Sequence, residues 1–274
     1  MSTEINKYAK QTTVPGTRRI AAQLVNYPDA INLTIGQPDF PTPEAVKQAG
    51  IKAIEADQTG YSVNMGIIEL REAINSFFTD KYGFSYDPET EIVVTSGSSE
   101  GLDSVLRTIL NEGDEVIIPS PTYMAYTSLL DLSGAKPVFL DTSDTDFIPS
   151  AERLEALITD KTKAIIFNYP SNPTGMTLSK DDTDKLVEVL AKHDIFILAD
   201  EIYSENVFVG EHHSFAAYPE IKDRLFLVHG VSKSHSMTGW RVGYVLGPAE
   251  LMQYVSRVFT TASRLPSKTS SSPS

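Results

Sequence analysis

The stretch EIVVTSGSSEGLDSVLRTILNEGDEVIIPS, residues 91–120, contains the unit that much of the chain repeats. It begins with a short β-branched run that ends at Gly97, continues with apolar residues at helical spacing, and ends in a second β-branched run. Both runs are continuous rather than alternating in polarity, which is typical of strands that helices cover on both faces. The stretch therefore predicts a strand–helix–strand unit of an α/β domain.

The alternation of strand-like and helix-like segments continues to residue 247. Further strands are expected over residues 136–141, 162–170, 195–201, 224–230 and 240–247. Helices are expected between several of them, over residues 123–135, 151–158 and 180–194. This order predicts a mostly parallel central sheet flanked by helices, whose ligands bind beyond the carboxyl ends of the strands.

The segments outside this region are simpler. Residues 1–30 are polar, with a short helix expected over 18–27, and two further helices are expected over 43–56 and 66–83. Residues 260–274 are rich in serine, proline and threonine without periodicity, which predicts a disordered tail.

Composition and charge narrow the class of protein. The chain has 274 residues, of which 41% are hydrophobic, enough for a substantial core, and its net charge of −13 argues against general binding to nucleic acids or anionic membranes. It contains no cysteine, so disulfides and cysteine-ligated metals are excluded, and we expect no metal site. The first residues lack the apolar core of a signal peptide, and no run approaches the roughly 18 apolar residues of a membrane span. We therefore expect a cytoplasmic protein that binds neither nucleic acids nor membranes.

Polar or glycine-rich segments follow four of the expected strands. They are TSGSSEG at 95–101, NYPSNPTG at 168–175, ILADEIY at 197–203 and HGVSKSHSMTGWRVGYVLGP at 229–248. Each has an ordinary structural explanation: a helix N-cap, a rigid turn, a capping or ion-paired carboxylate, and an interior salt bridge to Asp200 or Glu201. Each also has a functional explanation, because the ends of parallel strands meet at one edge of a sheet.

Together the four segments offer a set of groups that few ligands need. The glycine turn before residue 98 presents the amide groups and the dipole of a helix N-terminus to a phosphate. Asp200 supplies a partly buried carboxylate and Asn172 an amide donor. Lys233 and Arg241 supply two cations. Pyridoxal phosphate needs this combination: a phosphate site with an arginine, a carboxylate for its ring nitrogen, and a lysine for a Schiff base.

The motif around Lys233 resembles the signature of the class I/II aminotransferases, which are pyridoxal-phosphate-dependent enzymes of fold type I. Its members are Gly230, Val231, Ser232, Lys233, Ser236, Met237, Gly239, Arg241 and Gly243. The resemblance covers residues 15–260 in chain order, and LTIGQPDF, NYPSNPTG, ADEIYSE and SKSHSMTGWR are most similar to bacterial aromatic or aminotransferase A-like enzymes. It implies transamination between an L-amino acid, aromatic or otherwise, and a 2-oxo acid.

The resemblance also implies a role for each residue around the cofactor ring. Lys233 would form the Schiff base and then move a proton between the substrate α-carbon and the cofactor C4′ carbon. Asp200 would pair with the ring nitrogen, while Asn172 and Tyr203 would hydrogen-bond the phenolic oxygen of the ring. Tyr123 would stack on the ring.

For the cofactor phosphate, the resemblance implies a cradle that consists of Gly97, Ser98, Ser99 and Arg241. Tyr61 would reach the phosphate of a neighbouring subunit, which implies a homodimer with shared active sites. Gly36 would lie near the substrate carboxylate, and Asn172 is also expected to contact the substrate.

The chain departs from the family pattern at two places. Gly230 stands where many relatives carry serine, and relatives continue beyond residue 260 into a C-terminal domain that carries the arginine for the substrate carboxylate. Arg264 stands in a different sequence context. We therefore predict that the C-terminal small domain is missing. The predicted parts are an N-terminal arm with part of a small domain over 1–45, a large cofactor-binding domain over 46–259, and a disordered or aberrant tail over 260–274.

Three functional hypotheses follow. The first is a transaminase. The second is a C–S β-lyase on the same fold, although NPTG and DEIY resemble the transaminase forms. The third is a cofactor-binding protein without turnover: a truncated or frame-shifted product that keeps the cofactor-site residues and loses substrate binding. A second form of the third hypothesis is the sensor half of a transcription regulator. Such a regulator would need a basic helix-turn-helix before this domain, but residues 1–90 match the aminotransferase arm instead.

Overall fold

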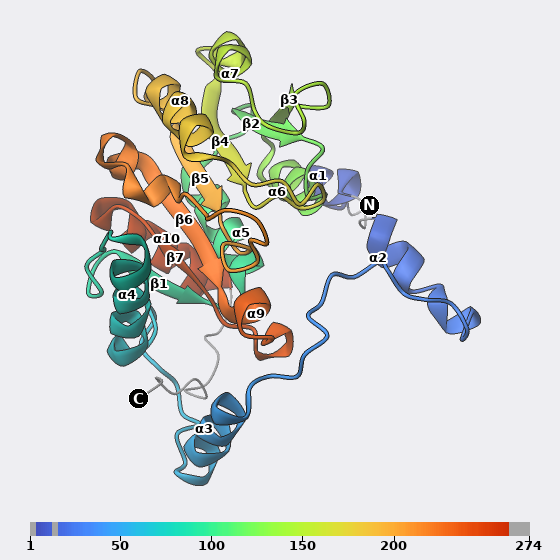
Figure 1. Ribbon diagram of the computed structural model, residues 1–274, viewed down its shortest axis with the longest axis vertical. Helices are drawn as coiled ribbons and strands as arrows, with labels where there is room; N and C mark the ends of the chain where they lie inside the picture. Colours follow the sequence, from blue (N-terminus) through green and yellow to red (C-terminus); the bar gives the residue numbers. More distant parts are fainter. Residues whose placement is uncertain (1–3, 13–15, 263–274) are drawn as a thin grey trace.

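The computed structural model describes residues 4–12 and 16–262. Its centre is one sheet of seven strands in the order β1-β7-β6-β5-β4-β2-β3 (Figure 1). The strands are β1 (Ile92–Thr95), β2 (Glu115–Ser120), β3 (Lys136–Asp141), β4 (Thr162–Asn168), β5 (Phe196–Asp200), β6 (Leu225–Gly230) and β7 (Gly243–Leu246). All neighbouring pairs are parallel except the two that β7 makes with β1 and β6. The predicted mostly parallel sheet is confirmed.

Helices cover both faces of this sheet, as the continuous strand patterns predict. One face carries α5 (Ser98–Ile109), α6 (Ala125–Ser133) and α10 (Ala249–Ala262), and the other carries α4 (Ile68–Tyr82), α7 (Ala151–Leu157) and α8 (Lys180–Leu190) (Figure 1). Alternate residues of a strand enter the two cores: Ile165 packs on the side of α4 and α8, and Ile166 on the side of α5 and α10. Within the described residues, no helix is both long and apolar enough to span a membrane.

The first helix, α1 (Lys7–Gln11), lies against this core. Asn6 caps it by accepting hydrogen bonds from the amides of Tyr8 and Ala9. The Tyr8 ring packs at Gly134, directly after α6, where any β-carbon would overlap it.

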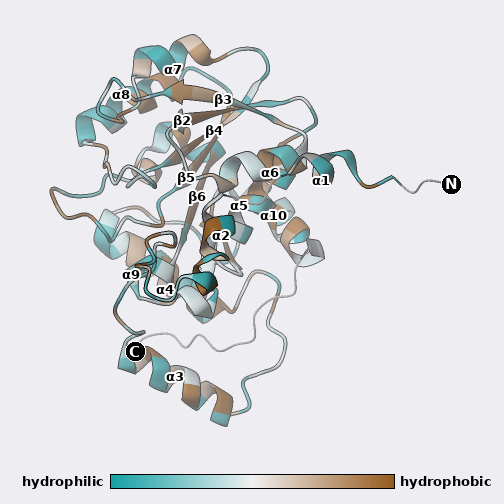
Figure 2. Ribbon diagram, turned by 90° about the vertical axis from the view of Figure 1, so that its right-hand side faces the viewer, coloured by the Kyte–Doolittle hydropathy of each residue, from teal (hydrophilic) through white to brown (hydrophobic). Residues whose placement is uncertain are grey.

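The chain then leaves the core. α2 (Gly16–Ala21) and the 3-10 turn η1 (Leu24–Asn26) are followed by an extended segment that leads to α3 (Glu44–Glu55), which stands away from the sheet (Figures 1 and 2). Large apolar side chains of the extended segment are open to solvent, with Ile31 87% and Leu33 89% exposed.

Two differences from the sequence expectations occur near the chain ends. The helix expected over 18–27 is broken into α2 and η1, because no residue of η1 is buried and short helices without packing are marginal. The sequence patterns did not single out α10, although it buries an apolar face on the sheet. Its described part reaches Ala262, past the predicted boundary at residue 259. Residues 263–274 of the predicted tail lie outside the described residues.

Candidate active site

The carboxyl ends of β4, β5 and β6 and the loop after β1 meet at one edge of the sheet. Asn168 of β4 pairs with Asp200 of β5, and Gly230 of β6 pairs with Gly243 of β7. Gly243 also pairs with Thr95, so the loop that follows β1 arrives at the same edge. The strand order thus brings together the four strand-end segments of the sequence.

Asp200 is a buried carboxylate. Its side chain is 4% exposed; Oδ2 accepts a hydrogen bond from the Tyr126 hydroxyl at 2.7 Å, and Oδ1 accepts one from the Ile202 amide at 3.3 Å. Among residues 4–12 and 16–262, no lysine, arginine or histidine forms an ion pair with it. Burial raises the pKa of Asp200 to about 6, against the opposing effect of the two hydrogen bonds. Such a carboxylate is suited to receive a cationic group of a ligand.

In the ligand-free protein, this raised pKa is expected to make the fold less stable as the pH rises from about 4 to about 6. The folded carboxyl holds its proton more tightly than the unfolded one, whose pKa is 3.8, so its stabilisation is complete below the unfolded pKa and is lost as the pH passes the folded pKa. At about 1.4 kcal/mol for each tenfold change in proton affinity, Asp200 contributes roughly 3 kcal/mol to the decline. Urea unfolding of wild type and of Asp200→Asn, whose amide does not titrate, measures this contribution as a difference. Equal pH slopes in the two proteins would contradict it.

Two of the predicted ring contacts lie next to Asp200. Asn168 links Asn172 to the end of β5. Its Nδ2 donates to the Asp200 backbone oxygen at 3.0 Å, and its Oδ1 accepts a hydrogen bond from the Asn172 backbone amide at 2.9 Å. Asn172 Nδ2 in turn donates to the Tyr203 hydroxyl at 3.5 Å. Burial, and then the charge of Asp200, raise the pKa of Tyr203, so its hydroxyl stays protonated and can donate a hydrogen bond.

The residues of the predicted phosphate cradle lie where two loops approach closely. Gly97 has a φ of +85°, and a β-carbon at this position would overlap the Arg241 guanidinium. A β-carbon on Gly243 would overlap the backbone of Gly97 and Ser98. Gly97 precedes α5 without a side-chain cap, so the first-turn amides at Ser98 and Ser99 receive no capping oxygen from it. A helix N-terminus beside a guanidinium is suited to a phosphate group.

Lys233 lies in the single helical turn α9 (Val231–Ser234) and is half-buried. Its Nζ donates a hydrogen bond to the Gly36 carbonyl oxygen at 2.6 Å and lies 5.8 Å from the centroid of the Tyr203 ring. Burial, and then the charge of Arg241, lower the pKa of Lys233, which favours the neutral amine. Lys233 therefore lies near the Tyr203 ring and within electrostatic reach of Arg241.

The interior salt bridge that would have explained the two cations is not formed within the described chain. Glu201 is buried, but its carboxylate contacts His212 Nε2 at 2.6 Å. Neither Lys233 nor Arg241 pairs with a carboxylate among the described residues. Both cations are therefore available to a ligand.

Tyr61 stays outside this cluster. Its side chain is 81% exposed in the segment between α3 and α4. Over residues 4–12 and 16–262, no hydrogen bond or ring contact joins Tyr61 to the other residues of the site.

Two residues that the sequence did not single out help to hold the arrangement together. Tyr126 of α6 donates to Asp200, and its ring meets that of Tyr123 edge-on with 5.5 Å between the centroids. Thr42 donates to the Ser236 carbonyl oxygen at 2.7 Å and so fastens the N-terminal segment to the loop after Lys233. No local motif marks either residue, because their partners lie 74 and 194 positions away.

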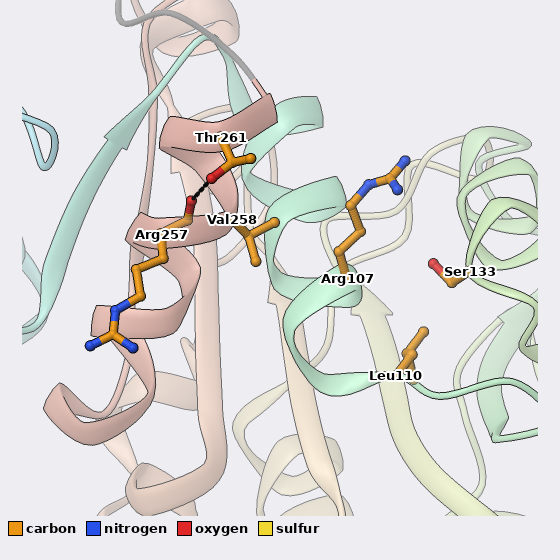
Figure 3. A pocket seen from close by; sticks show the side chains of 6 residues that line it. All are labelled: Arg107, Leu110, Ser133, Arg257, Val258 and Thr261. Carbon is orange, nitrogen blue, oxygen red and sulfur yellow. Dashed lines mark hydrogen bonds between the residues drawn. The ribbon is translucent and has the colours of Figure 1, made fainter.

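A surface hollow of about 560 Å³ lies at the other end of α5 (Figure 3). The residues that line it are Arg107, Leu110, Ser133, Arg257, Val258 and Thr261. The Arg107 guanidinium is already bound to the Asp103 carboxylate at 2.8 Å. None of the strand-end groups reaches this hollow, so it is separate from the candidate active site.

Comparison with known proteins agrees with this geometry. A family model described as aminotransferase class I and II matches residues 28–272. The chain is 42% identical over 254 residues to a probable N-acetyl-LL-diaminopimelate aminotransferase of Bacillus subtilis, covering 93% of this chain and 64% of that protein. It is 38% identical over 229 residues to an aromatic-amino-acid aminotransferase 2 of Thermococcus litoralis, covering 83% of this chain and 59% of that protein.

Solved structures of aminotransferases also resemble this chain. The aspartate aminotransferase of Thermus thermophilus with maleate aligns with a TM-score of 0.93 and 33% identity, over 98% of this chain and 71% of that chain. This chain spans 64% of the length of the Bacillus relative. The names of these proteins differ in substrate and agree in the type of reaction. The chain belongs to the family of class I and II aminotransferases.

Proposed function

We propose that this chain binds pyridoxal 5′-phosphate and catalyses transamination between an L-amino acid and a 2-oxo acid. The observation that carries the proposal is the convergence of Lys233 Nζ, the buried Asp200 carboxylate and the Gly97–Arg241 contact at one edge of the sheet. When bound, pyridoxal phosphate supplies an aldehyde for amines and a protonated ring that withdraws electrons from the substrate α-carbon.

The residues present fit this cofactor at both of its ends. The Asp200 carboxylate is buried without a counter-ion among the described residues, and a protonated ring nitrogen would supply one. The Arg241 guanidinium and the amides that begin α5 at Ser98 and Ser99 would hold the phosphate. The glycine at position 97 leaves room for the guanidinium to approach this helix end.

Between these ends, the chain's own side chains would control orientation and proton transfer. Asn172 and Tyr203 would donate hydrogen bonds to the phenolic oxygen, and Tyr123 would cover one face of the ring. The amine of Lys233, whose lowered pKa favours the neutral form, would hold the cofactor through its aldehyde carbon and would carry the proton at the substrate α-carbon. The Gly36 carbonyl, 2.6 Å from Lys233 Nζ, would line the side on which the substrate enters.

The test is nitrogen transfer. Purified protein with pyridoxal phosphate is incubated with a ¹⁵N-labelled L-amino acid and a 2-oxo acid, and the label is followed into the new amino acid by mass spectrometry. The donors begin with aromatic amino acids, which the sequence resemblance favours, and include aspartate. Label transfer is expected. Release of ammonia from cystathionine without a 2-oxo acid would support a C–S β-lyase instead, and cofactor binding without either product would support a protein without turnover.

We further propose a homodimer in which Tyr61 completes the phosphate site of the partner. The exposed Tyr61 ring and the exposed apolar side chains of the segment that precedes α3 support this proposal. Mixing two inactive variants, Tyr61→Ala and Lys233→Ala, is expected to restore activity. Each mixed dimer then contains one site with an intact Lys233 and an intact Tyr61 from the partner. Failure of refolded mixtures to exceed the activity of either variant alone would contradict shared sites, and sedimentation of the mixture as a monomer would contradict the dimer.

A further inference from the structure

The hydrogen bond between Tyr126 and Asp200 joins the buried end of α6 to the end of β5. The Tyr126 side chain is 0% exposed and its hydroxyl lies 2.7 Å from Asp200 Oδ2. Its ring is part of the core between the sheet and α5, α6 and α10. The bond crosses 74 positions of sequence and lies wholly inside the protein, so water does not compete for either group.

Few other groups reach the Asp200 carboxylate. The Ile202 amide approaches Oδ1 at 3.3 Å, and Asn168 Nδ2 is bound to the backbone oxygen rather than to the carboxylate. Within the described part of the chain, Tyr126 is the side chain that donates to this carboxylate. The Tyr126 hydroxyl therefore occupies Oδ2 and leaves Oδ1 with one long hydrogen bond.

Tyr126 also touches the residue that is proposed to cover the cofactor ring. Its ring lies edge-on to Tyr123 with 5.5 Å between centroids, and its amide donates to the Tyr123 carbonyl oxygen at 3.2 Å. Burial, and then the charge of Asp200, hold the pKa of Tyr126 far above its usual value. The phenol therefore stays protonated and acts as a donor to the carboxylate.

We propose that Tyr126 is a positioning residue for the cofactor: its hydroxyl holds the Asp200 carboxylate ionised, with Oδ1 directed to the ring nitrogen. This inference rests on the proposed function, because it needs the ring nitrogen to meet Asp200. A donor hydrogen bond stabilises the ionised form of a carboxyl and fixes which oxygen is available. A purely structural role would instead be the filling of the core by a tyrosine whose hydroxyl has found a partner.

Tyr126→Phe tests the proposal, since it removes the hydroxyl and keeps the ring. In the cofactor-free protein, the Asp200 carboxyl, identified by its absence in Asp200→Asn, is expected to titrate at higher pH by ¹³C NMR. In the loaded protein, the dissociation constant for pyridoxal phosphate is expected to rise roughly tenfold, the loss typical of one charge-assisted hydrogen bond. Tyr218→Phe is the matched control, because Tyr218 donates to Asp184 at 2.6 Å away from the site.

A double-mutant cycle separates positioning from packing. If Tyr126 acts through Asp200, Tyr126→Phe adds little to the loss of cofactor affinity in an Asp200→Asn background. If it acts only through packing, the two losses add, and the proposal is overturned. An unchanged Asp200 titration with unchanged cofactor affinity overturns it as well.

Failure of the proposed function and failure of the Tyr126 variant to fold give different results. If wild type binds no pyridoxal phosphate, the proposed function fails, whereas the Asp200 titration still reports on the Tyr126 hydrogen bond. If Tyr126→Phe does not fold, the ¹³Cζ signal of Tyr126 in wild type is compared with and without cofactor. A shift that is lost in Asp200→Asn supports the positioning role, and the absence of any shift in wild type overturns it.

Discussion

Lys233→Ala is expected to abolish the visible absorbance that wild type acquires with pyridoxal phosphate, and to reduce nitrogen transfer by at least about 10⁴-fold. The physical reason is that, in the proposed function, the same amine would hold the cofactor and carry the proton at the substrate α-carbon. Its pKa is lowered by burial and by Arg241, so a larger fraction is neutral and reactive near neutral pH. Lys233 is the one lysine in the four strand-end segments, and no other lysine among the described residues hydrogen-bonds to a residue of these segments.

The attachment of the cofactor to Lys233 can be measured directly. Borohydride reduction of loaded wild type, followed by peptide mapping, is expected to place the cofactor mass on the peptide that contains Lys233. Lys222→Ala is the control, because Lys222 also donates to a backbone carbonyl, that of Ser85 at 3.0 Å, but it precedes β6, whereas Lys233 follows the carboxyl end of that strand. A visible, pH-dependent band that persists in Lys233→Ala, or cofactor mass on another lysine, would refute the assignment.

Asp200→Asn has the second largest expected effect. The amide keeps the size of the side chain and an acceptor for Tyr126, but it removes the charge that a protonated ring nitrogen would face. Loss of one partner from a buried charge pair costs about 3–5 kcal/mol, which corresponds to roughly 10²–10⁴-fold weaker cofactor binding. Nitrogen transfer is expected to fall at least as much, because a neutral ring withdraws electrons less strongly from the substrate.

Equilibrium dialysis with pyridoxal phosphate measures the affinity, and thermal unfolding without cofactor measures the fold. The ligand-free variant is expected to be as stable as wild type or more stable near neutral pH, because it no longer holds an uncompensated buried charge. Asp184→Asn removes another carboxylate that accepts from a tyrosine and serves as the control. Asp200→Asn with wild-type affinity would show that this carboxylate does not meet the ring.

The sequence by itself determined the class of fold and which polar residue types stand at the strand ends. Hydrophobic periodicity is a local property, so residues 91–247 predict strands and helices without reference to distant partners. Continuous β-branched runs predict a sheet covered on both faces, and Ile165 and Ile166 indeed enter opposite cores. The motif around Lys233 likewise needs no distant partner to be recognised, because its residues all lie within positions 230–243.

Local sequence patterns did not predict two helical segments correctly, because packing against the rest of the chain decides whether such a helix forms. The helix expected over 18–27 had suitable residues but lacks a surface to bury against, and it breaks. In contrast, α10 was not expected from the sequence but forms, because its apolar face packs on the sheet beside α5. Neither outcome follows from propensity, because tertiary contacts supply most of the stability of a helix.

Only the tertiary structure decided which groups meet. The insertion of β7 between β1 and β6 places Gly243 against Gly97, and this contact brings the Arg241 guanidinium to the start of α5. Tyr126 reaches Asp200 across 74 positions, and Lys233 reaches the Gly36 carbonyl across 197. Strand order and such long-range contacts depend on the free energy of the whole packed chain, whereas periodicity reports only whether each segment can bury one face.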